Sequence, residues 1–419
     1  MRKIIIAPDS FKGSLTSTEF CRIAEECICE ILPDCQVAKI PVADGGEGTL
    51  DAVLSALPEG ERITITVSGP YMNPTAASYG LFRRDDDCAL TAVIEMAQAA
   101  GLPLAQKYAA ENLPSGKTDP RLTSTHGVGE LISDAIDRGA KHIILGLGGS
   151  STNDAGCGCA AALGAVFYDA DGNQFIPAGG TLSDIVRIDT TALRQHLQGI
   201  SITAMCDITN PMYGEHGAAY VFGPQKGADN NAILKLDEGL RHVAGIFDSL
   251  MLSSIGSADN ADYASSDSAN NILNADIHSI SSLPGSGAAG AYGAGVVALM
   301  DGRLHSGIDT LLDMCSFDQL LEDADMVITG EGRIDSQSID GKALSGIAHR
   351  VSDHNRSMNE HTRLIAFCGQ ISDKDTVISQ MEFDDIICIN PAGEDAAYSM
   401  EHAGCNFRRT FTEYLKELI

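Results

Sequence analysis

The sequence is poor in basic residues: it has 28 Lys and Arg against 57 Asp and Glu, a formal net charge of −29 over 419 residues. This excess of negative charge repels phosphate backbones and anionic lipids, and so argues against nucleic acid and membrane surfaces as partners. No apolar run approaches the roughly 18 residues of a membrane span, and the run Ile4–Ala7 is too short for a signal peptide. We therefore expect a cytoplasmic protein.

Common metal and nucleophile motifs are also missing. There is no His-Glu-x-x-His, no calcium loop and no Gly-x-Ser-x-Gly elbow. The twelve cysteines are scattered, and Cys27-x-Cys29 and Cys157-x-Cys159 lack the spacer and the second ligand pair of a zinc knuckle. Ser115-Gly-Lys-Thr118 resembles the end of a P-loop, but the first glycine and the preceding strand are absent, so the segment is expected to be an ordinary loop.

The composition is otherwise that of a globular chain of two or three domains, with 44% apolar and 20% charged residues. Short β-branched runs alternate with amphipathic helical periods, which predicts an α/β fold with mainly parallel sheets. Thr16-Ser-Thr-Glu19 is a capping box and predicts a helix that ends before Pro33. The expected strands are Lys3–Ala7, Val37–Val42, Arg62–Val67, Ala89–Met96, His142–Leu147, Ser201–Cys206, Met326–Thr329, Leu364–Cys368 and Asp385–Ile389.

The middle of the chain has a different pattern. Residues 62–82 alternate apolar and polar, and residues 166–176 predict a hairpin around Asp171-Gly172. Residues 253–282 are rich in Ser, Ala, Asp and Asn, which predicts a long surface loop or a flexible insertion. We expect a discontinuous first domain, residues 1–60 plus 310–419, into which a second α/β domain, residues 61–309, is inserted.

Charged residues and glycines follow the strands expected in the first domain. Ligands of open α/β sheets bind beyond the carboxyl ends of the strands, so these residues would converge if their strands share one sheet. Glycines permit close backbone approach, carboxylates suit a proton or a metal, and cations suit phosphate or carboxylate. Capped turns and solvated cations are the alternatives. The candidates are Asp9, Ser10, Lys12, Asp44, Gly45, Gly46, Glu47, Arg333, Asp335 and Lys342.

A polar Gly/Ser loop follows the strand expected at 142–147 in the second domain. Such loops cradle phosphates with backbone N–H and hydroxyl groups. The rivals are a dinucleotide fold, although Gly146-x-Gly148-x-x-Ser151 misses its third glycine, and a small-residue turn that packs a helix on a sheet. Asp207 follows another strand and suits a metal or substrate hydroxyls, with a cap at the strand end as the alternative. The remaining candidates are Gly148, Gly149, Ser150, Ser151, Asn153, Asp154 and Lys226, the last on a glycine turn.

Seven motifs in this order resemble the bacterial type I glycerate kinase family. They are Ala7–Ser14, Pro41–Thr49, Gly148–Asp154, Cys206–Pro211, Phe222–Gly227, Gly287–Gly290 and Thr329–Asp335. The resemblance implies a flavodoxin-like domain with an inserted α/β domain. It also implies phosphorylation of D-glycerate by ATP with Mg²⁺, giving 2-phosphoglycerate and ADP, with 3-phosphoglycerate as the alternative product.

Residue roles follow as hypotheses. The Gly148–Asp154 loop and Lys226 would hold the nucleotide phosphates, and Asp207 would hold Mg²⁺. Arg333, or Lys12 together with the Asp44–Gly48 turn, would bind the glycerate carboxylate. Asp44 would accept the hydroxyl proton, with Asp335 as runner-up.

The two clusters lie in different expected domains, which predicts a site in a cleft, and a homodimer is one option for the assembly. A nicotinamide-dependent hydroxy-acid oxidoreductase and a non-catalytic sensor of small anions remain the rival functions.

Overall fold

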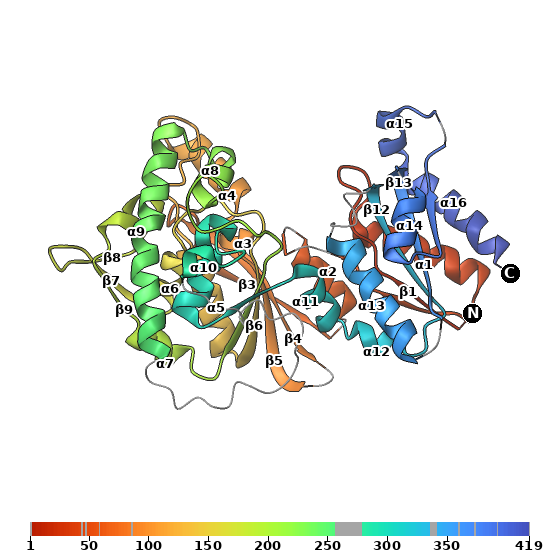
Figure 1. Ribbon diagram of the computed structural model, residues 1–419, viewed down its shortest axis with the longest axis horizontal. Coiled ribbons are helices and arrows are strands. Elements are labelled where there is room, and N and C mark those ends of the chain that lie inside the picture. The colour runs from red at the N-terminus through yellow and green to blue at the C-terminus, as the bar shows by residue number, and fades with distance from the viewer. Residues whose placement is uncertain are drawn as a thin grey trace. The chain divides into compact units, whose positions relative to one another are not determined.

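The computed structural model describes residues 2–42, 45–46, 48–57, 59–84, 87–255, 279–335, 342–358, 361–372, 374–391 and 393–418. The chain divides into two compact units (Figure 1). Unit 1 comprises Met1–Asp44, Asp51–Pro58 and Gly307–Ile419, and unit 2 comprises Gly45–Leu50 and Glu59–Ser306. Gly45–Leu50, which we expected in the first domain, make their contacts within unit 2.

Unit 1 is built on a five-stranded sheet in the order β14-β13-β12-β1-β2, and every neighbouring pair is parallel. Numbered by their order in the chain, the strands run 2-1-3-4-5, which is the order of flavodoxin-like folds. The expected flavodoxin-like sheet is therefore confirmed. The strands are β1 (Lys3–Ile6), β2 (Gln36–Lys39), β12 (Met326–Ile334), β13 (Arg363–Ile371) and β14 (Asp385–Cys388).

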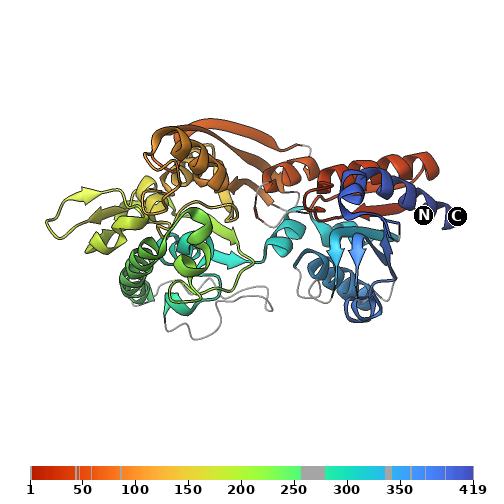
Figure 2. The ribbon, with the colours of Figure 1, turned by 90° about the horizontal axis from the view of Figure 1, so that it is seen from above.

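Helices cover both faces of this sheet (Figure 2). The predicted capping box is present: Thr16 accepts from the N–H of Glu19, and the Glu19 side chain accepts from the N–H of Thr16. On one face, Phe20 stacks on Phe407, with ring centroids 3.8 Å apart, above the β-strand core. The helices are α1 (Ser17–Ile31), α2 (Thr49–Ala56, shared with unit 2), α11 (Gly307–Met314), α12 (Phe317–Leu321), α13 (Lys342–Met358), α14 (Lys374–Met381), α15 (Ala396–Glu401) and α16 (Ala403–Glu417).

Unit 2 is built on a six-stranded sheet in the order β11-β10-β6-β5-β4-β3. The strands β5, β6, β10 and β11 pair in parallel, whereas β3 and β4 form an antiparallel extension. The parallel part places the ends of β5, β6 and β10 at one edge. The strands are β3 (Glu61–Ser68), β4 (Pro74–Arg84), β5 (Asp87–Glu95), β6 (Ala140–Gly146), β10 (Ser201–Met205) and β11 (Arg303–His305).

The rest of unit 2 packs around this sheet. The expected hairpin at 166–176 is confirmed as the antiparallel pair β7 (Val166–Tyr168) and β8 (Gln174–Phe175). A third strand, β9 (Arg187–Asp189), pairs with the other edge of β7. Most of the expected 253–282 insertion lies outside the described residues. The helices are α3 (Ala97–Ala100), α4 (Leu102–Asn112), α5 (His126–Asp137), α6 (Cys157–Ala162), η1 (Gly179–Asp184), α7 (Thr191–His196), α8 (Ala218–Phe222), η2 (Pro224–Lys226), α9 (Asn230–Ile255), η5 (Ile280–Ser282) and α10 (Ala288–Met300).

The longest of these helices is α9, with 26 residues. Neither α9 nor any other helix in the described ranges combines the length and apolarity needed to cross a membrane.

Candidate active site

Two glycine turns that lie far apart in the sequence meet at the end of β6. Gly148 donates a backbone hydrogen bond to the carbonyl of Gly45 at 3.0 Å. A Cβ atom on Gly148 would lie 2.4 Å from the Cα of Gly46, and one on Gly146 would lie 2.5 Å from the oxygen of Gly45. Both positions therefore require glycine, because no side chain fits between the two backbones. Three of the predicted site residues, Gly45, Gly46 and Gly148, are thus in contact within unit 2.

Glu95, the last residue of β5, orients the start of α2. Its carboxylate accepts a hydrogen bond from the backbone N–H of Leu50 at 2.6 Å and another from the Gln98 side chain at 3.1 Å. Glu95 is almost fully buried, and a carboxylate at a helix N-terminus complements the unpaired N–H groups and the helix dipole. Glu95 was not predicted from the sequence. The available signal was a carboxylate directly after the apolar run Ala92–Ile94.

The polar run Ser150–Asp154, which the sequence predicts as a phosphate cradle, is buried. Its side chains are between 0% and 8% exposed. The Ser151 hydroxyl donates to the carbonyl of Ala100 at 2.8 Å, and the Thr123 hydroxyl donates to the carbonyl of Ser151 at 3.0 Å. The Ser151 side chain therefore holds the loop in place, and its hydroxyl donates to the protein itself.

Lys226 points into the same loop from η2. Its ammonium nitrogen donates to the Ser150 hydroxyl at 2.9 Å and to the Thr152 carbonyl at 2.7 Å. The residue is 2% exposed. Desolvation lowers the pKa of Lys226 to about 7, and the nearby Asp154 carboxylate opposes this only in part. The predicted association of Lys226 with the loop is therefore present, and its charge is poised near neutral pH.

Asp154 organises the other end of the loop. Its carboxylate accepts hydrogen bonds from the N–H and the hydroxyl of Thr125, at 2.7 and 2.8 Å, and from the N–H of Gly158 at 3.2 Å. Burial raises the pKa of Asp154, and these donors oppose the rise. Asp154 thus links the loop to the start of α5 and to α6 through hydrogen bonds. This position favours a structural role for Asp154.

The backbone around this loop is strained. Ala289, Gly290 and Ala291 form a run of three left-handed residues, with φ of 53°, 71° and 67°, and Ala155 also has a positive φ of 52°. A Cβ atom on Gly290 would lie 2.1 Å from the carbonyl oxygen of Thr152. Left-handed alanines are unfavourable and persist only where the surroundings enforce them, typically at functional sites.

Some polar atoms of the loop have no hydrogen-bond partner among the described residues. These are the Thr152 hydroxyl and both the oxygen and the nitrogen of the Asn153 amide. Both residues are fully buried. Leaving such groups unpaired costs free energy, and a bound polar group would supply the missing bonds.

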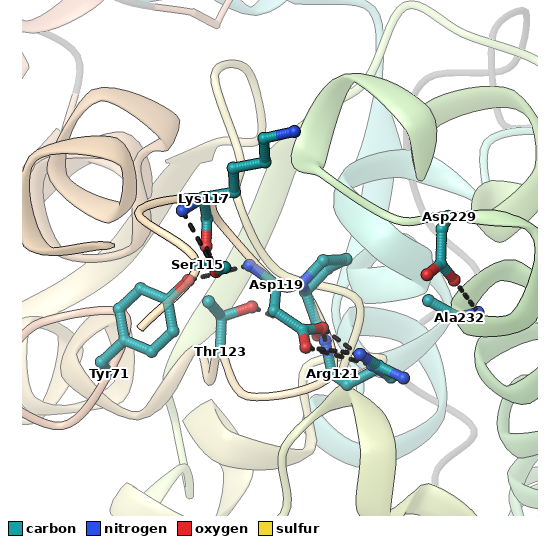
Figure 3. Close-up of polar contacts among 9 residues, drawn as sticks. Tyr71, Ser115, Lys117, Asp119, Arg121, Thr123, Asp229 and Ala232 are labelled. Atoms are coloured by element: carbon teal, nitrogen blue, oxygen red, sulfur yellow. Dashed lines mark hydrogen bonds and ion pairs between the residues drawn. The ribbon is translucent and has the colours of Figure 1, made fainter. Parts of the chain in front are cut away.

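A neighbouring loop, which contains Ser115, Lys117, Asp119 and Arg121, is held by polar contacts of its own and with Tyr71 (Figure 3). Arg121 forms a two-pronged pair with the Asp119 carboxylate, and Asp119 donates its N–H to the hydroxyl of Tyr71 at 3.0 Å. Gly227 packs on this loop so closely that a Cβ atom would lie 2.2 Å from the Thr118 carbonyl. The expectation that Ser115–Thr118 is an ordinary loop is confirmed, since these residues form a turn outside any helix or strand.

Unit 1 contains a cavity of about 700 Å³ at the carboxyl ends of β1, β12, β13 and β14. In a doubly wound sheet, ligands bind where the strand order reverses, here between β1 and β12. Predicted residues Ser10, Lys12 and Arg333 line the cavity. The other lining residues are Phe11, Ser14, Glu331, Gly332, Gly369, Gln370, Ile371, Ser372, Cys388, Ile389, Asn390, Pro391, Gly393, Glu394, Ser399, Met400 and Ala403.

Two predicted residues of unit 1 are paired with each other. The Arg333 guanidinium lies 2.9 Å from the Asp335 carboxylate, and the Arg333 side chain is 65% exposed while that of Asp335 is 18% exposed. Asp335 is therefore positioned to orient Arg333. Asp9, also predicted, accepts a hydrogen bond from the N–H of Ser10 at 2.6 Å, which shapes the turn after β1.

Some predicted residues lie outside the part of the chain that the structure describes. Asp44 and Glu47 lie outside the described residues, as does the side chain of Lys342. Asp207 follows β10 in unit 2 and is partly buried. Within the described ranges, no three His, Cys, Asp or Glu residues gather as a ready-made metal site.

Taken by itself, the molecule is a two-unit α/β protein with candidate anion-binding sites at the ends of parallel strands. Comparison with known proteins makes the assignment specific. The sequence profile described as the glycerate kinase family matches residues 4–418. A glycerate kinase from Bacillus cereus is 39% identical over 95% of this chain and 93% of its own length, and a glycerate 2-kinase from Escherichia coli is 38% identical over 92% and 90%.

A solved structure agrees. The crystal structure of a protein assigned as glycerate kinase 2 from Salmonella typhimurium LT2 covers 100% of this chain and 98% of its own, with 36% identity and a TM-score of 0.78. The chain belongs to the glycerate kinase family. It is an enzyme, a kinase with an alcohol group as acceptor.

Proposed function

We propose that the protein transfers the γ-phosphoryl group of ATP to the 2-hydroxyl of D-glycerate, giving 2-phosphoglycerate and ADP. The observation that carries the proposal is the match of the whole chain, residues 4–418, to a family whose similar members are named glycerate kinases. The E. coli relative is named a glycerate 2-kinase, which favours the 2-hydroxyl as acceptor. The 3-hydroxyl is the alternative acceptor.

The loop at the end of β6 is the proposed site for the nucleotide phosphates. Gly149 and Ser150 offer backbone groups, Gly148 holds the loop against Gly45 through its own N–H, and Lys226 supplies a positive charge within reach of the Ser150 hydroxyl. A nearby polyphosphate favours the charged form of Lys226, so binding would recharge a lysine that burial keeps close to neutral. The unpaired amide of Asn153 would gain partners at the same time.

The cavity in unit 1 is the proposed site for the substrate carboxylate. Lys12 and Arg333 line it at the ends of β1 and β12. A guanidinium held by Asp335 can form a two-pronged pair with a carboxylate, which fixes orientation as well as charge. Ser10 and the turn held by Asp9 would add polar contacts. Asp44 is the proposed proton acceptor, and Asp335 is the runner-up.

Mg²⁺ is the proposed cofactor, with Asp207 as the protein ligand. One carboxylate suffices for such a site, because Mg²⁺ keeps several waters and is bound through one or two carboxylates plus substrate phosphates. When bound, the ion would neutralise phosphate charge. A cytoplasmic location is a further proposal, which the absence of long apolar runs favours, and a homodimer is the proposed assembly.

Phosphorus NMR of the product tests the proposed acceptor. The phosphorus of 2-phosphoglycerate couples to one carbon-bound proton and appears as a doublet, whereas that of 3-phosphoglycerate couples to two and appears as a triplet. We expect a doublet from a reaction of the purified protein with ATP, Mg²⁺ and D-glycerate. A triplet would mean that the protein is a glycerate kinase but phosphorylates the 3-hydroxyl instead of the 2-hydroxyl.

A further inference from the structure

Two cysteines face each other across neighbouring strands of unit 1. Cys368 on β13 and Cys388 at the end of β14 are directly paired in the parallel register. Neighbouring strands lie about 4.7–4.9 Å apart, which is inside the range of about 4.4–6.8 Å that Cα atoms span in disulfides. Paired residues of adjacent strands also project to the same face of the sheet. The backbone therefore already meets the distance requirement for a bond between the two sulfurs.

The two thiols differ in exposure. Cys388 is exposed and lines the 700 Å³ cavity, where its Sγ lies 3.3 Å from the carbonyl oxygen of Gly369. Cys368 is fully buried behind it, with its Sγ 3.7 Å from the carbonyl oxygen of Ile387. A small oxidant that enters the cavity thus reaches Cys388 first.

The same arrangement separates the acidities of the two thiols. A hydrogen bond from the Cys368 thiol lowers the pKa of Cys388 to about 6 and raises that of Cys368. Thiolates, and not thiols, react with oxidants, and sensor cysteines combine low pKa, exposure and a resolving partner. Cys388 has the properties of the attacking residue, and Cys368 those of the resolving residue.

Another close pair in the chain lacks this arrangement. Cys157 and Cys159 are two residues apart on α6, so they project from different sides of the helix. Both are fully buried, and burial raises the pKa of each thiol. Cys157 and Cys159 therefore act as packing residues of the core.

We propose that Cys368 and Cys388 form a thiol–disulfide redox site at the wall of the unit 1 cavity, with hydrogen peroxide as its oxidant. The Cys388 thiolate attacks one peroxide oxygen, the O–O bond breaks, and hydroxide leaves and takes up a proton to become water. The Cys368 sulfur then attacks the resulting sulfenic acid, an S–S bond forms, and a second water leaves with the proton of Cys368. The net change oxidises two thiols to one disulfide and reduces one peroxide to two waters. This chemistry is independent of the proposed kinase function.

Peptide mapping of the full-length protein tests the proposal. After treatment with hydrogen peroxide, the remaining thiols are blocked with N-ethylmaleimide, and the protein is digested with trypsin without reduction. We expect the peptide 364–374, which contains Cys368, to be joined to the peptide 375–408, which contains Cys388. Cys405 lies in the second peptide as well, and its alkylated state shows which sulfur is used. Dithiothreitol should restore the separate peptides.

Three variants separate the steps. Cys388→Ser should abolish the linkage, Cys405→Ser should leave it intact, and Cys368→Ala should leave a sulfenic acid on Cys388 that dimedone traps. Because Cys368 is buried, thermal unfolding of its variant checks that the fold is kept, and dimedone labelling of the wild type at short times gives a second readout. Alkylated Cys388 and no linkage after peroxide treatment of the folded wild type would overturn the proposal. A linkage through Cys405, or Cys388 oxidised to sulfinic acid beside a free Cys368, would overturn it equally.

Discussion

The ammonium nitrogen of Lys226 lies 2.9 Å from the hydroxyl of Ser150, a residue 76 positions away in the chain. The contact closes a buried polar loop at the end of β6 and places a lysine with a pKa of about 7 inside it. A lysine in this state can gain a proton when an anion arrives, which is the property that the proposed phosphate site needs.

Lys226 should impose its own pH dependence on stability. The unfolded lysine has a pKa of about 10.4, so between pH 7 and 10 the unfolded state binds more protons at this residue, and its contribution to the free energy of unfolding rises with pH. The difference in unfolding free energy between wild type and Lys226→Met, measured with urea at pH 7, 8 and 9, should change in favour of the wild type by up to about 1.4 kcal/mol per pH unit.

Lys141→Met is the matched control, because Lys141 is exposed at the start of β6. Its difference from wild type should be flat with pH. A flat difference for Lys226→Met as well would mean that Lys226 is not held near neutrality.

Asp154→Ala should destabilise unit 2. One carboxylate oxygen accepts from the N–H and the hydroxyl of Thr125 and from the N–H of Gly158, and alanine has no atom that can accept any of these bonds. Unpaired buried groups cost about 1–3 kcal/mol each, so we expect a loss of at least about 2 kcal/mol in chemical denaturation. Asp171→Ala in the exposed hairpin turn should leave stability unchanged, and equal stability of both variants would contradict the structural role of Asp154.

Gly290→Ala should disrupt the strained loop. Its Cβ atom would lie 2.1 Å from the Thr152 carbonyl oxygen, and the residue has a φ of +71°. Displacement of the loop by about 1 Å would lower kcat/KM on the order of 100-fold if the loop binds phosphates. Gly245→Ala in α9 is the control, since nothing lies within 4 Å of its Cβ and alanine is favoured there by about 1 kcal/mol. Both variants are compared by steady-state kinetics. Full activity of Gly290→Ala would show that the loop is not part of the active site.

Arg333→Gln should weaken substrate binding selectively. Hydrogen bonds to charged groups contribute about 1.5–3 kcal/mol, so KM for D-glycerate should rise about 10-fold or more while KM for ATP stays constant. Arg22→Gln, which removes an exposed i,i+4 pair with Glu26, should change neither constant. An unchanged KM for D-glycerate, or an equal rise in both constants, would refute the assignment of Arg333 to the carboxylate.

Alkylation of Cys388 should begin at low pH. Its pKa of about 6 depends on the hydrogen bond from Cys368, which favours the thiolate. The rate with iodoacetamide should therefore reach half its maximum near pH 6, and Cys368→Ala should shift this midpoint upward. Exposed Cys405 lies in the same tryptic peptide and serves as an internal reference. Equal midpoints in wild type and variant would exclude the hydrogen bond as the cause.

Local signals predicted the fold well. The capping box Thr16–Glu19 and the hairpin at 166–176 depend on residues a few positions apart, and both formed as expected. The flavodoxin-like strand order followed from the family resemblance, because periodicity alone does not specify which strands pair. The helix-start role of Glu95 was missed for the same reason: its partner, Leu50, is 45 residues away.

The site was only partly predictable. The sequence selected Ser150, Asp154 and Lys226 by residue type and glycine context, and the structure brings them into one loop region. It could not indicate that the Asp154 carboxylate accepts hydrogen bonds from Thr125, because the donors that surround Asp154 come from distant segments. Nor could it predict the left-handed run at Ala289–Ala291, because alanine gives no local signal for a positive φ.

Release of ADP from ATP tests the central claim most directly. The purified protein is incubated with ATP and Mg²⁺, and ADP is measured with D-glycerate, L-glycerate, glycerol or no acceptor. We predict rapid ADP release that depends on D-glycerate and falls to background with glycerol and without an acceptor. Folded protein that releases no more ADP with D-glycerate than without it would contradict the assignment of this chain as a glycerate kinase.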